Sequence, residues 1–190
     1  MAHTPLSKSE QRELLKRAKK AIENRLERKP LPSIAETRKK FPSLSEKKAS
    51  FVTLTNGNEL RGCIGSIYPR RPLCEDIAEN AIAAAFHDPR FEPMTMAEFK
   101  KTKIKISVLS EPEEIKPKSE AELLDCLKAW PGLILENRGF SAVYLPEVWE
   151  ELPDPKVFLE SLCAKAGLPE NAWKGKGTKF WVFSTQSFWP

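Results

Sequence analysis

The chain has 190 residues, of which 41% are hydrophobic and 30% charged, and its net charge is +5. This composition is ordinary for a soluble globular protein, and the length fits one domain that can contain two lobes. The sequence shows neither a signal peptide nor a membrane-spanning stretch, and its four cysteines form no Cys-x-x-Cys pair. We therefore expect a cytoplasmic protein with free thiols and no zinc finger.

The positive charge is concentrated near the N-terminus. Residues 1–48 carry 14 Lys or Arg and six Asp or Glu, a net charge of +8, whereas the remaining 142 residues carry 17 and 20, a net charge of −3. A face rich in Lys and Arg is typical of nucleic-acid-binding proteins. A solvated helix next to a flexible loop has the same pattern, so both interpretations stay open.

The first predicted element is a helix. A capping box at Ser7-x-x-Glu10 precedes a helical stripe of apolar residues over 14–26, and proline ends the helix soon afterwards. Residues 30–48 contain three prolines, a Lys/Arg run and few large apolar groups. We expect a long, exposed, basic loop there.

Residues 49–68 are predicted to form a β-hairpin. Two β-favouring segments flank an Asn56-Gly57 turn, and the second carries the motif Leu60-Arg61-Gly62-Cys63-Ile64-Gly65. Unless a bulge intervenes, strand alternation places Arg61, Cys63 and Gly65 on one face and the other three residues on the opposite face. Because glycine weakens a strand, the two glycines indicate that a neighbouring segment or a ligand approaches the backbone here.

A helix over residues 73–86 and a loop over residues 87–93 come next. An alanine run indicates that the helix packs closely on the sheet, and Asn80 falls on or beside its buried stripe. A buried Asn80 needs hydrogen-bond partners, and these can belong to a neighbouring loop or to a ligand. Two prolines prevent a regular helix in the loop, where Asp88 and Arg90 can pair with each other or with other groups.

The second half of the chain is predicted to alternate short helices with strands. Strict alternation predicts a half-buried strand over residues 103–109. The other predicted elements are a short helix after a Thr95-x-x-Glu98 capping box, a charged loop at 111–118, a helix from 119, a hairpin at 133–145, a helix at 154–166, a loop at 175–178, a strand at 180–183 and a tail that folds back at Phe188 and Trp189. Since the strands come as hairpins among helices, we expect an α/β fold of the α+β type, with a mostly antiparallel, mixed sheet flanked by helices.

Cys63 is the candidate nucleophile. Arg61 or His87 can favour its thiolate, but a free cysteine more often packs as a small hydrophobic residue. Arg61 can clamp a carboxylate or phosphate, or it can form a structural ion pair with Asp88 or a glutamate. The sequence lacks paired-carboxylate, Ser-His-Asp, zinc-protease and Rossmann patterns, so we expect no metal site and no cofactor.

The motif at residues 60–65 resembles the hallmark of the AMMECR family, the domain named after the AMME-syndrome candidate gene. The resemblance covers residues 10–185. Further blocks occur in the family's order: the helix with Asn80, Asp88-Pro89-Arg90-Phe91, Val108-Leu109-Ser110, Gly132-Leu133-Ile134-Leu135, Leu145-Pro146-Glu147-Val148-Trp149 and the segment 162–168.

This resemblance implies one domain over residues 1–190 with two lobes, of which the larger has a mostly antiparallel sheet flanked by helices. It implies no established activity. Prokaryotic members are associated with Memo-like and radical-SAM proteins, which points to a shared pathway and to modification of RNA or another macromolecule.

The residues that match family positions are Arg61, Cys63, Asn80, Asp88 and Arg90. With Gly62 and Gly65, they form the predicted site, in which Cys63 is the catalytic candidate and the others bind. The family pattern does not require a histidine at His87, which argues against a Cys63–His87 pair.

Two functions stay open after the sequence. One is an enzyme, or an enzyme subunit, whose cleft is lined by residues 60–65, Asn80 and the loop after it. The other is a non-catalytic adaptor that binds a protein, or that binds nucleic acid through the basic N-terminal segment. The residues do not decide whether the chain is an enzyme.

Overall fold

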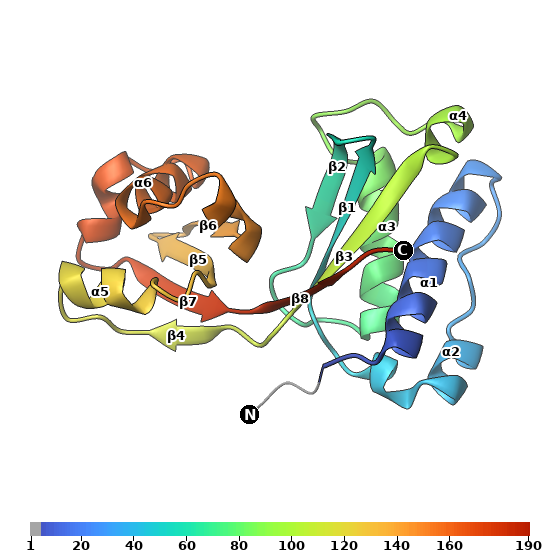
Figure 1. Ribbon diagram of the computed structural model, residues 1–190, viewed down its shortest axis with the longest axis horizontal. Helices are drawn as coiled ribbons and strands as arrows, with labels where there is room; N and C mark the ends of the chain where they lie inside the picture. Colours follow the sequence, from blue (N-terminus) through green and yellow to red (C-terminus); the bar gives the residue numbers. More distant parts are fainter. Residues whose placement is uncertain (1–4) are drawn as a thin grey trace. The chain divides into compact units, whose positions relative to one another are not determined.

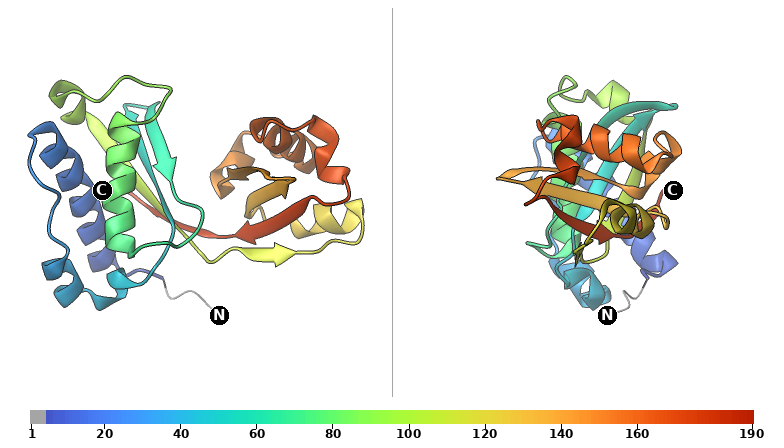
Figure 2. Two further views of the ribbon diagram at one scale, coloured as in Figure 1. Left: turned by 180° about the vertical axis from the view of Figure 1, so that it is seen from behind. Right: turned by 90° about the vertical axis from the view of Figure 1, so that its left-hand side faces the viewer.

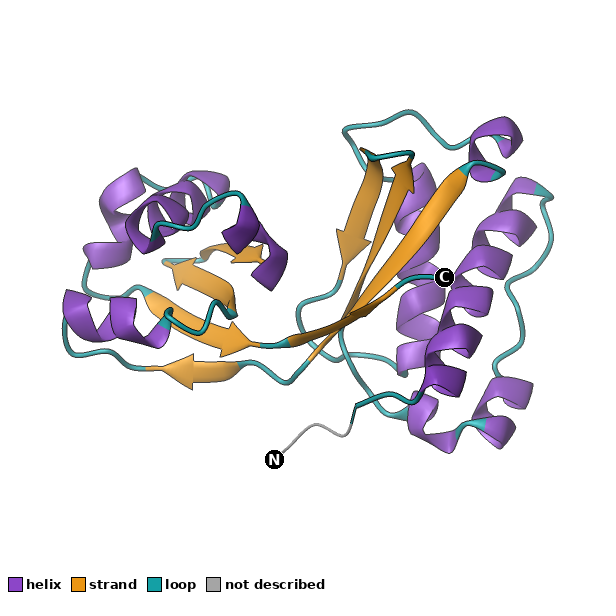
Figure 3. Ribbon diagram, viewed as in Figure 1, coloured by secondary structure: helices purple, strands orange, loops and turns teal. Residues whose placement is uncertain are grey.

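Two four-stranded sheets, each with its own helices and core, make up residues 5–190, which the computed structural model describes (Figures 1 and 3). Unit 1 comprises the chain up to Glu111 together with Gln186–Pro190, and unit 2 comprises Pro112–Thr185 (Figure 2). The predicted α+β class is confirmed. The strands form two separate sheets, each with its own helices, whereas the sequence predicted a single sheet.

The sheet of unit 1 has the strand order β2-β1-β3-β8. Its strands are β1 (Ser50–Asn56), β2 (Glu59–Gly65), β3 (Thr102–Leu109) and β8 (Thr185–Phe188). β1 pairs antiparallel with both β2 and β3, which confirms the predicted hairpin. β2 is an edge strand, so its outer backbone groups need partners that a strand does not supply.

Helices α1 (Lys8–Leu26) and α3 (Leu73–Phe86) pack against each other and cover one face of this sheet (Figure 1). The predicted stripes are the reason. The stripe of α3 is fully buried, and that of α1 is buried except for the partly exposed Leu15 and Leu26. The short helix α4 (Met96–Phe99) also contacts α1. α1 begins at the predicted capping box at Ser7.

Residues 30–48 are mostly exposed, as the sequence predicts, but they are not a loop throughout. They contain helix α2 (Ala35–Lys40) and a 3-10 helix at Pro42–Ser45, in which Leu44 is fully buried. Arg17 of α1 fixes the start of this segment by donating to the carbonyl oxygens of Pro32 and Ser33, each at 3.0 Å. These anchors are long-range, which is why the local pattern of prolines and charges did not reveal them.

The sheet of unit 2 has the order β4-β7-β5-β6, and all its pairs are antiparallel. A stacked pair, Trp149 and Phe158, lies in its core with ring centroids 3.7 Å apart. The elements of the unit are β4 (Glu113–Ile115), α5 (Glu120–Cys126), β5 (Gly132–Asn137), β6 (Phe140–Tyr144), α6 (Pro155–Lys165), β7 (Lys179–Phe183) and 3-10 helices at Pro146–Glu150 and Glu170–Lys174.

Two strands lie where the sequence predicts none. β4 lies inside the segment expected to be a charged loop, and β8 is formed by the C-terminal tail. Phe188 is buried as expected, whereas Trp189 is 66% exposed, so the tail folds back only in part. Such short strands show no alternation and form because a neighbouring strand pairs with them. All four cysteines are free, and none of the helices in residues 5–190 is long and apolar enough to cross a membrane.

Candidate functional site

A β-bulge displaces Arg61 from the alternation of β2. The register pairs Leu54 with Gly62 and Thr55 with Leu60, so Arg61 is the extra residue on its strand. The predicted common environment of Arg61 and Cys63 is therefore wrong. The Arg61 side chain reaches α4, whereas the Cys63 thiol lies beside Thr53 of β1.

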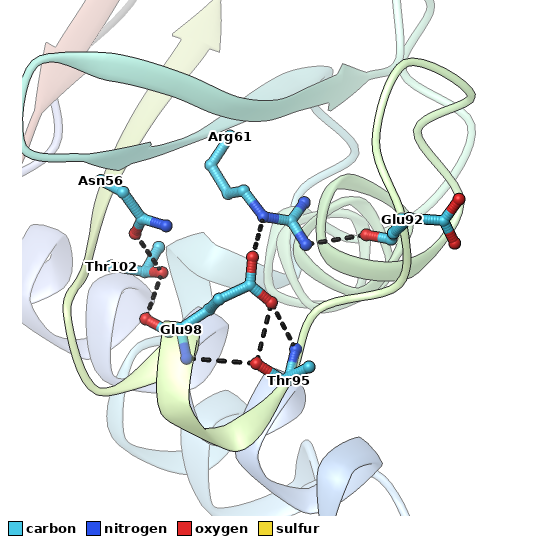
Figure 4. Close-up of polar contacts among 6 residues, drawn as sticks. All are labelled: Asn56, Arg61, Glu92, Thr95, Glu98 and Thr102. Carbon is cyan, nitrogen blue, oxygen red and sulfur yellow. Dashed lines mark hydrogen bonds and ion pairs between the residues drawn. The ribbon is translucent and has the colours of Figure 1, made fainter.

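The Arg61 guanidinium joins β2 to the segment before and within α4 (Figure 4). Its Nε donates to Glu98 Oε1 at 2.8 Å, and its Nη2 donates to the carbonyl oxygen of Glu92 at 2.7 Å. Phe91 completes the surroundings, with its ring centroid 5.6 Å from the guanidinium carbon. Arg61 is only 8% exposed, so these groups, and not solvent, surround its charge, and the buried Nη1 has no hydrogen-bond partner among the described residues.

Glu98 has two tasks in this arrangement. Its carboxylate accepts from Arg61 through one oxygen and from the backbone N–H and hydroxyl of Thr95 through the other, as the capping box requires. The hydrogen bond from Arg61, followed by that from the Thr95 backbone, lowers the pKa of Glu98 to about 2. The carboxylate is thus held ionised and is unsuited to act as a general base near neutral pH.

Cys63 and the loop after α3 meet at the outer edge of β2. Asp88 accepts the Cys63 backbone N–H at 2.9 Å, and Arg90 donates to both carboxylate oxygens of Asp88, at 2.9 and 2.7 Å. The hydrogen bonds from Arg90 are the main cause that lowers the pKa of the buried Asp88, with the Cys63 backbone contributing further. The thiol itself shares a hydrogen bond with Thr53 Oγ1 at 3.3 Å.

Asn80 belongs to a separate, buried polar network under β1. Its amide nitrogen donates to the Ser50 carbonyl oxygen at 3.0 Å and to Asp76 Oδ2 at 2.9 Å. The same Asp76 oxygen accepts from the hydroxyls of Ser50 and Ser66, at 2.7 and 2.8 Å. Of the two roles considered for Asn80, this network supports the one that holds neighbouring segments.

The two glycines of the motif each accommodate another part of unit 1. A Cβ at Gly62 would overlap the carbonyl oxygen of Ala84, so α3 can approach the sheet only where this side chain is missing. A Cβ at Gly65 would overlap the ring of Phe51, its cross-strand partner. In both cases the close neighbour is the protein itself.

The predicted site residues therefore form three bonded groups instead of lining one cavity. Arg61 bonds to Glu98, Asp88 and Arg90 bond to the edge of β2 at Cys63, and Asn80 bonds to Asp76. Two cavities of about 540 and 210 Å³ are both lined by other residues. The exposed His87 forms no hydrogen bond to Cys63 among the described residues.

Sequence reasoning missed Glu98 and Asp76 as partners of the site. The capping box at Thr95 identified Glu98 as a helix-starting residue, but nothing in it indicated Arg61, which is 37 positions away. Asp76 carries a clearer signal, because it precedes Asn80 by one helical turn and shares its face.

Comparison of the sequence with known protein families finds a match over most of the chain. The model of the AMMECR1 family matches residues 15–188. The chain belongs to the AMMECR1 family. The match begins inside α1 and extends through β8, so it includes both units of the fold.

Two relatives of this AMMECR1-family chain match it over nearly its whole length. Protein NEQ441 of Nanoarchaeum equitans is 37% identical over 92% of this chain and 97% of its own. A protein of Methanothermobacter thermautotrophicus is 36% identical over 99% and 98%, respectively. The crystal structure of the uncharacterised protein PH0010 from Pyrococcus horikoshii matches with a TM-score of 0.84 and 35% identity over 92% of this chain and 88% of that one. These names state no activity, so function has to be argued from the residues.

Proposed function

We propose that this AMMECR1-family protein binds nucleic acid and serves in macromolecule modification, with RNA as the first candidate, as a binding subunit and not as the catalyst. The proposal rests on a basic stripe along α1 formed by Lys8, Arg12, Lys16 and Lys19. All four side chains are exposed, and none lies within ion-pair distance of a carboxylate in residues 5–190. Such a row is the electrostatic pattern that contacts phosphates.

Helical geometry brings these four residues together. They occupy positions i, i+4, i+8 and i+11 of α1, which fall within one side of a helix with 3.6 residues per turn. The opposite side, with Leu14, Ala18 and Ile22, is buried in the core of unit 1. The stripe therefore faces away from the rest of the unit, where an extended ligand can reach it.

Several other basic groups of this segment have partners within the protein. Arg17 is buried and bonded to backbone carbonyls, Lys20 pairs with Glu23 at 2.7 Å, and Arg38 pairs with Glu75 at 2.8 Å. Lys20 and Arg38 fit the interpretation of an ordinary solvated surface, and the proposal of nucleic-acid binding rests on the stripe alone. The stripe differs from these groups because its four side chains lie together on one side of a helix and none has an ion pair with the described residues, which leaves their charge available for a partner.

The motif at residues 60–65 supports a structural role in this proposal. Its arginine, its glycines and the Cys63 backbone all contact other parts of unit 1. The chemical step then belongs to a partner protein, and the Memo-like and radical-SAM proteins that accompany similar sequences are the candidates we propose. The AMMECR1-family chain would hold the nucleic acid for that partner.

The test is the salt dependence of RNA binding, measured by fluorescence anisotropy with a labelled single-stranded RNA. For single strands, each lost phosphate contact reduces the slope of log affinity against log salt by about 0.7, so the double variant K16Q/K19Q should reduce it by about 1.4. The matched control is K100Q/K101Q, which removes two exposed charges from the same unit outside the stripe. No binding at low salt, or an equal loss in the control, would contradict the proposal.

A further inference from the structure

Unit 2 contains a cavity of about 540 Å³ that none of the predicted site residues lines. Its walls come from two segments that are far apart in the sequence, 114–120 and 173–180, together with Leu123 of α5. Both segments belong to unit 2, because β4 and β7 pair directly with each other. We refer to this feature as the unit 2 cavity.

Lysines are concentrated at the unit 2 cavity. Residues 112–185 carry nine Lys or Arg and twelve Asp or Glu, a net charge of −3. Five of those nine basic residues line the cavity, but only two of the twelve acidic residues do, Glu114 and Glu120. The lysines are Lys116, Lys118, Lys174, Lys176 and Lys179. An otherwise acidic unit thus has a cavity with a local charge of +3, which favours an anionic ligand.

Three of these lysines are not neutralised by the protein. Lys116 pairs with Glu114 at 3.0 Å and Lys174 with Glu120 at 3.5 Å. Within the part of the chain that the structure describes, the ammonium groups of Lys118, Lys176 and Lys179 have no carboxylate within ion-pair distance. Like charges around one cavity repel each other unless an anion lies between them.

A buried hydrogen-bond donor is also left over at this wall. Trp173 is only 3% exposed, and its Nε1–H is buried without a hydrogen-bond partner among the described residues. A buried N–H that makes no hydrogen bond costs free energy, so such a group in a native fold needs an explanation. This nitrogen has almost no accessible surface, so the indole N–H serves as a probe of the cavity wall and is not itself a group that a ligand in the open cavity contacts.

The loop over residues 174–178 is held in place by the Thr178 side chain. Thr178 Oγ1 donates to the Ala172 carbonyl oxygen at 2.7 Å and accepts from the Asn137 amide at 2.6 Å. The preceding residue, Gly177, has φ +100°, a conformation that favours glycine, and has open space where a Cβ would stand. The loop therefore presents Lys176 from a fixed frame, with backbone that a ligand can approach closely.

We propose that the unit 2 cavity binds a small molecule that carries a phosphate group and is about the size of a mononucleotide. The volume lies in the usual range for small-molecule sites, roughly 300–1,000 Å³. Lysine ammonium groups bind phosphate as point charges. Ile115, Leu123 and Phe180 supply an apolar wall for the remainder of the molecule. This site shares no residue with the α1 stripe, so each proposal can fail without the other.

The test is a titration of the full-length, ¹⁵N-labelled protein with adenosine 5′-monophosphate, followed by nuclear magnetic resonance. The amide signals of Gly175 and Gly177 and the indole N–H of Trp173, assigned with W173F, should shift and saturate. The double variant K118Q/K176Q should weaken binding by about tenfold or more, because charge-assisted hydrogen bonds to the phosphate are lost. The matched control K128Q/R138Q removes two charges from unit 2 outside the cavity and should bind normally.

Titrations with other ligands distinguish a mononucleotide site from a site for any anion and from a site for nucleic-acid phosphates. Adenosine, which lacks the phosphate, should bind far more weakly than the monophosphate. Sulfate binding with the same affinity as the monophosphate would overturn the proposal, because the site would then accept any anion. A short single-stranded RNA that shifts these signals when the monophosphate does not would also overturn it, in favour of nucleic-acid phosphates. The proposal would also be overturned if millimolar adenosine 5′-monophosphate produced no saturable shift of these signals.

Discussion

The carboxylate of Asp88 accepts the backbone N–H of Cys63 at 2.9 Å and so caps the outer edge of β2. An edge strand leaves such N–H groups unpaired, and an uncovered edge invites pairing with another chain. Arg90 holds the capping carboxylate in place through two further hydrogen bonds. The Asp-Pro-Arg sequence after α3 is therefore explained by the strand that it protects.

Replacing Asp88 by alanine should lower the free energy of unfolding by about 2–3 kcal/mol, because a buried charged acceptor and its bonds to a backbone N–H are lost. Urea denaturation at neutral pH measures this. Arg90→Gln is the matched control and should cost less than half as much, since the Arg90 side chain is 54% exposed and water can replace it. Equal losses for the two variants would show that the ion pair, and not the backbone cap, carries the stabilisation.

The glycines of the motif should differ in their tolerance of a methyl group. Gly62→Ala places its Cβ against the backbone of α3 at Ala84, which cannot move without shifting the helix, so we expect a loss of about 3 kcal/mol or more. Gly65→Ala meets only the Phe51 ring, which can rotate, and should cost about 1–2 kcal/mol.

The double variant F51A/G65A tests this explanation by chemical denaturation. Removal of the ring should make the added methyl group at position 65 nearly neutral relative to F51A alone. If Gly65→Ala costs as much in the F51A background as in the wild type, the ring is not the obstacle.

Local chemistry predicted most elements of the fold. The capping boxes at Ser7 and Thr95, the Asn56-Gly57 turn and the alternation over residues 103–109 all lie where the structure has the corresponding helix ends, turn and strand. The elements that escaped, α2, β4 and β8, are short and form through contacts with distant segments. These segments are too short to show a recognisable hydrophobic periodicity.

The candidate site was harder to predict than the fold for a related reason. The sequence identified Arg61, Asp88 and Asn80 as polar groups that need partners, which the structure provides. It could not show the bulge that separates Arg61 from Cys63, because the bulge is a property of the pairing with β1. The unit 2 cavity was equally hidden, since its two lysine-bearing segments meet only through β4 and β7.

Acid should weaken unit 1 through Glu98. Its pKa in the folded protein is about 2, below the ordinary value of 4.5, so the folded state binds fewer protons and the ion pair stabilises it above pH 4.5. This stabilisation should decline as the pH falls from about 4.5 to about 2, and the lowered pKa of Asp88 acts in the same direction. The midpoints of urea unfolding, measured at several pH values from neutral down to about 2, give the pH dependence of the stability.

Glu98→Gln is the control for the acid response. The variant should be less stable than the wild type at neutral pH and should lose less stability than the wild type on acidification, so the two curves should converge at low pH. Parallel curves would show that other carboxylates, and not the Arg61–Glu98 pair, govern acid unfolding of this unit.

Thiol reactivity separates a structural Cys63 from a catalytic one. By exposure alone, iodoacetamide should label Cys126 first, Cys63 more slowly, and Cys74 and Cys163 only on unfolding, since both are fully buried and burial raises their pKa. Mass spectrometry of peptides sampled over time gives the four rates, and C126S allows Cys63 to be followed alone. The hydrogen bond between the Cys63 thiol and Thr53 is weak, so Thr53→Val should change the labelling rate of Cys63 only a few-fold. A Cys63 that is labelled faster than the exposed Cys126 would instead be an activated thiol, and an enzyme centred on residues 60–65 would become the better interpretation.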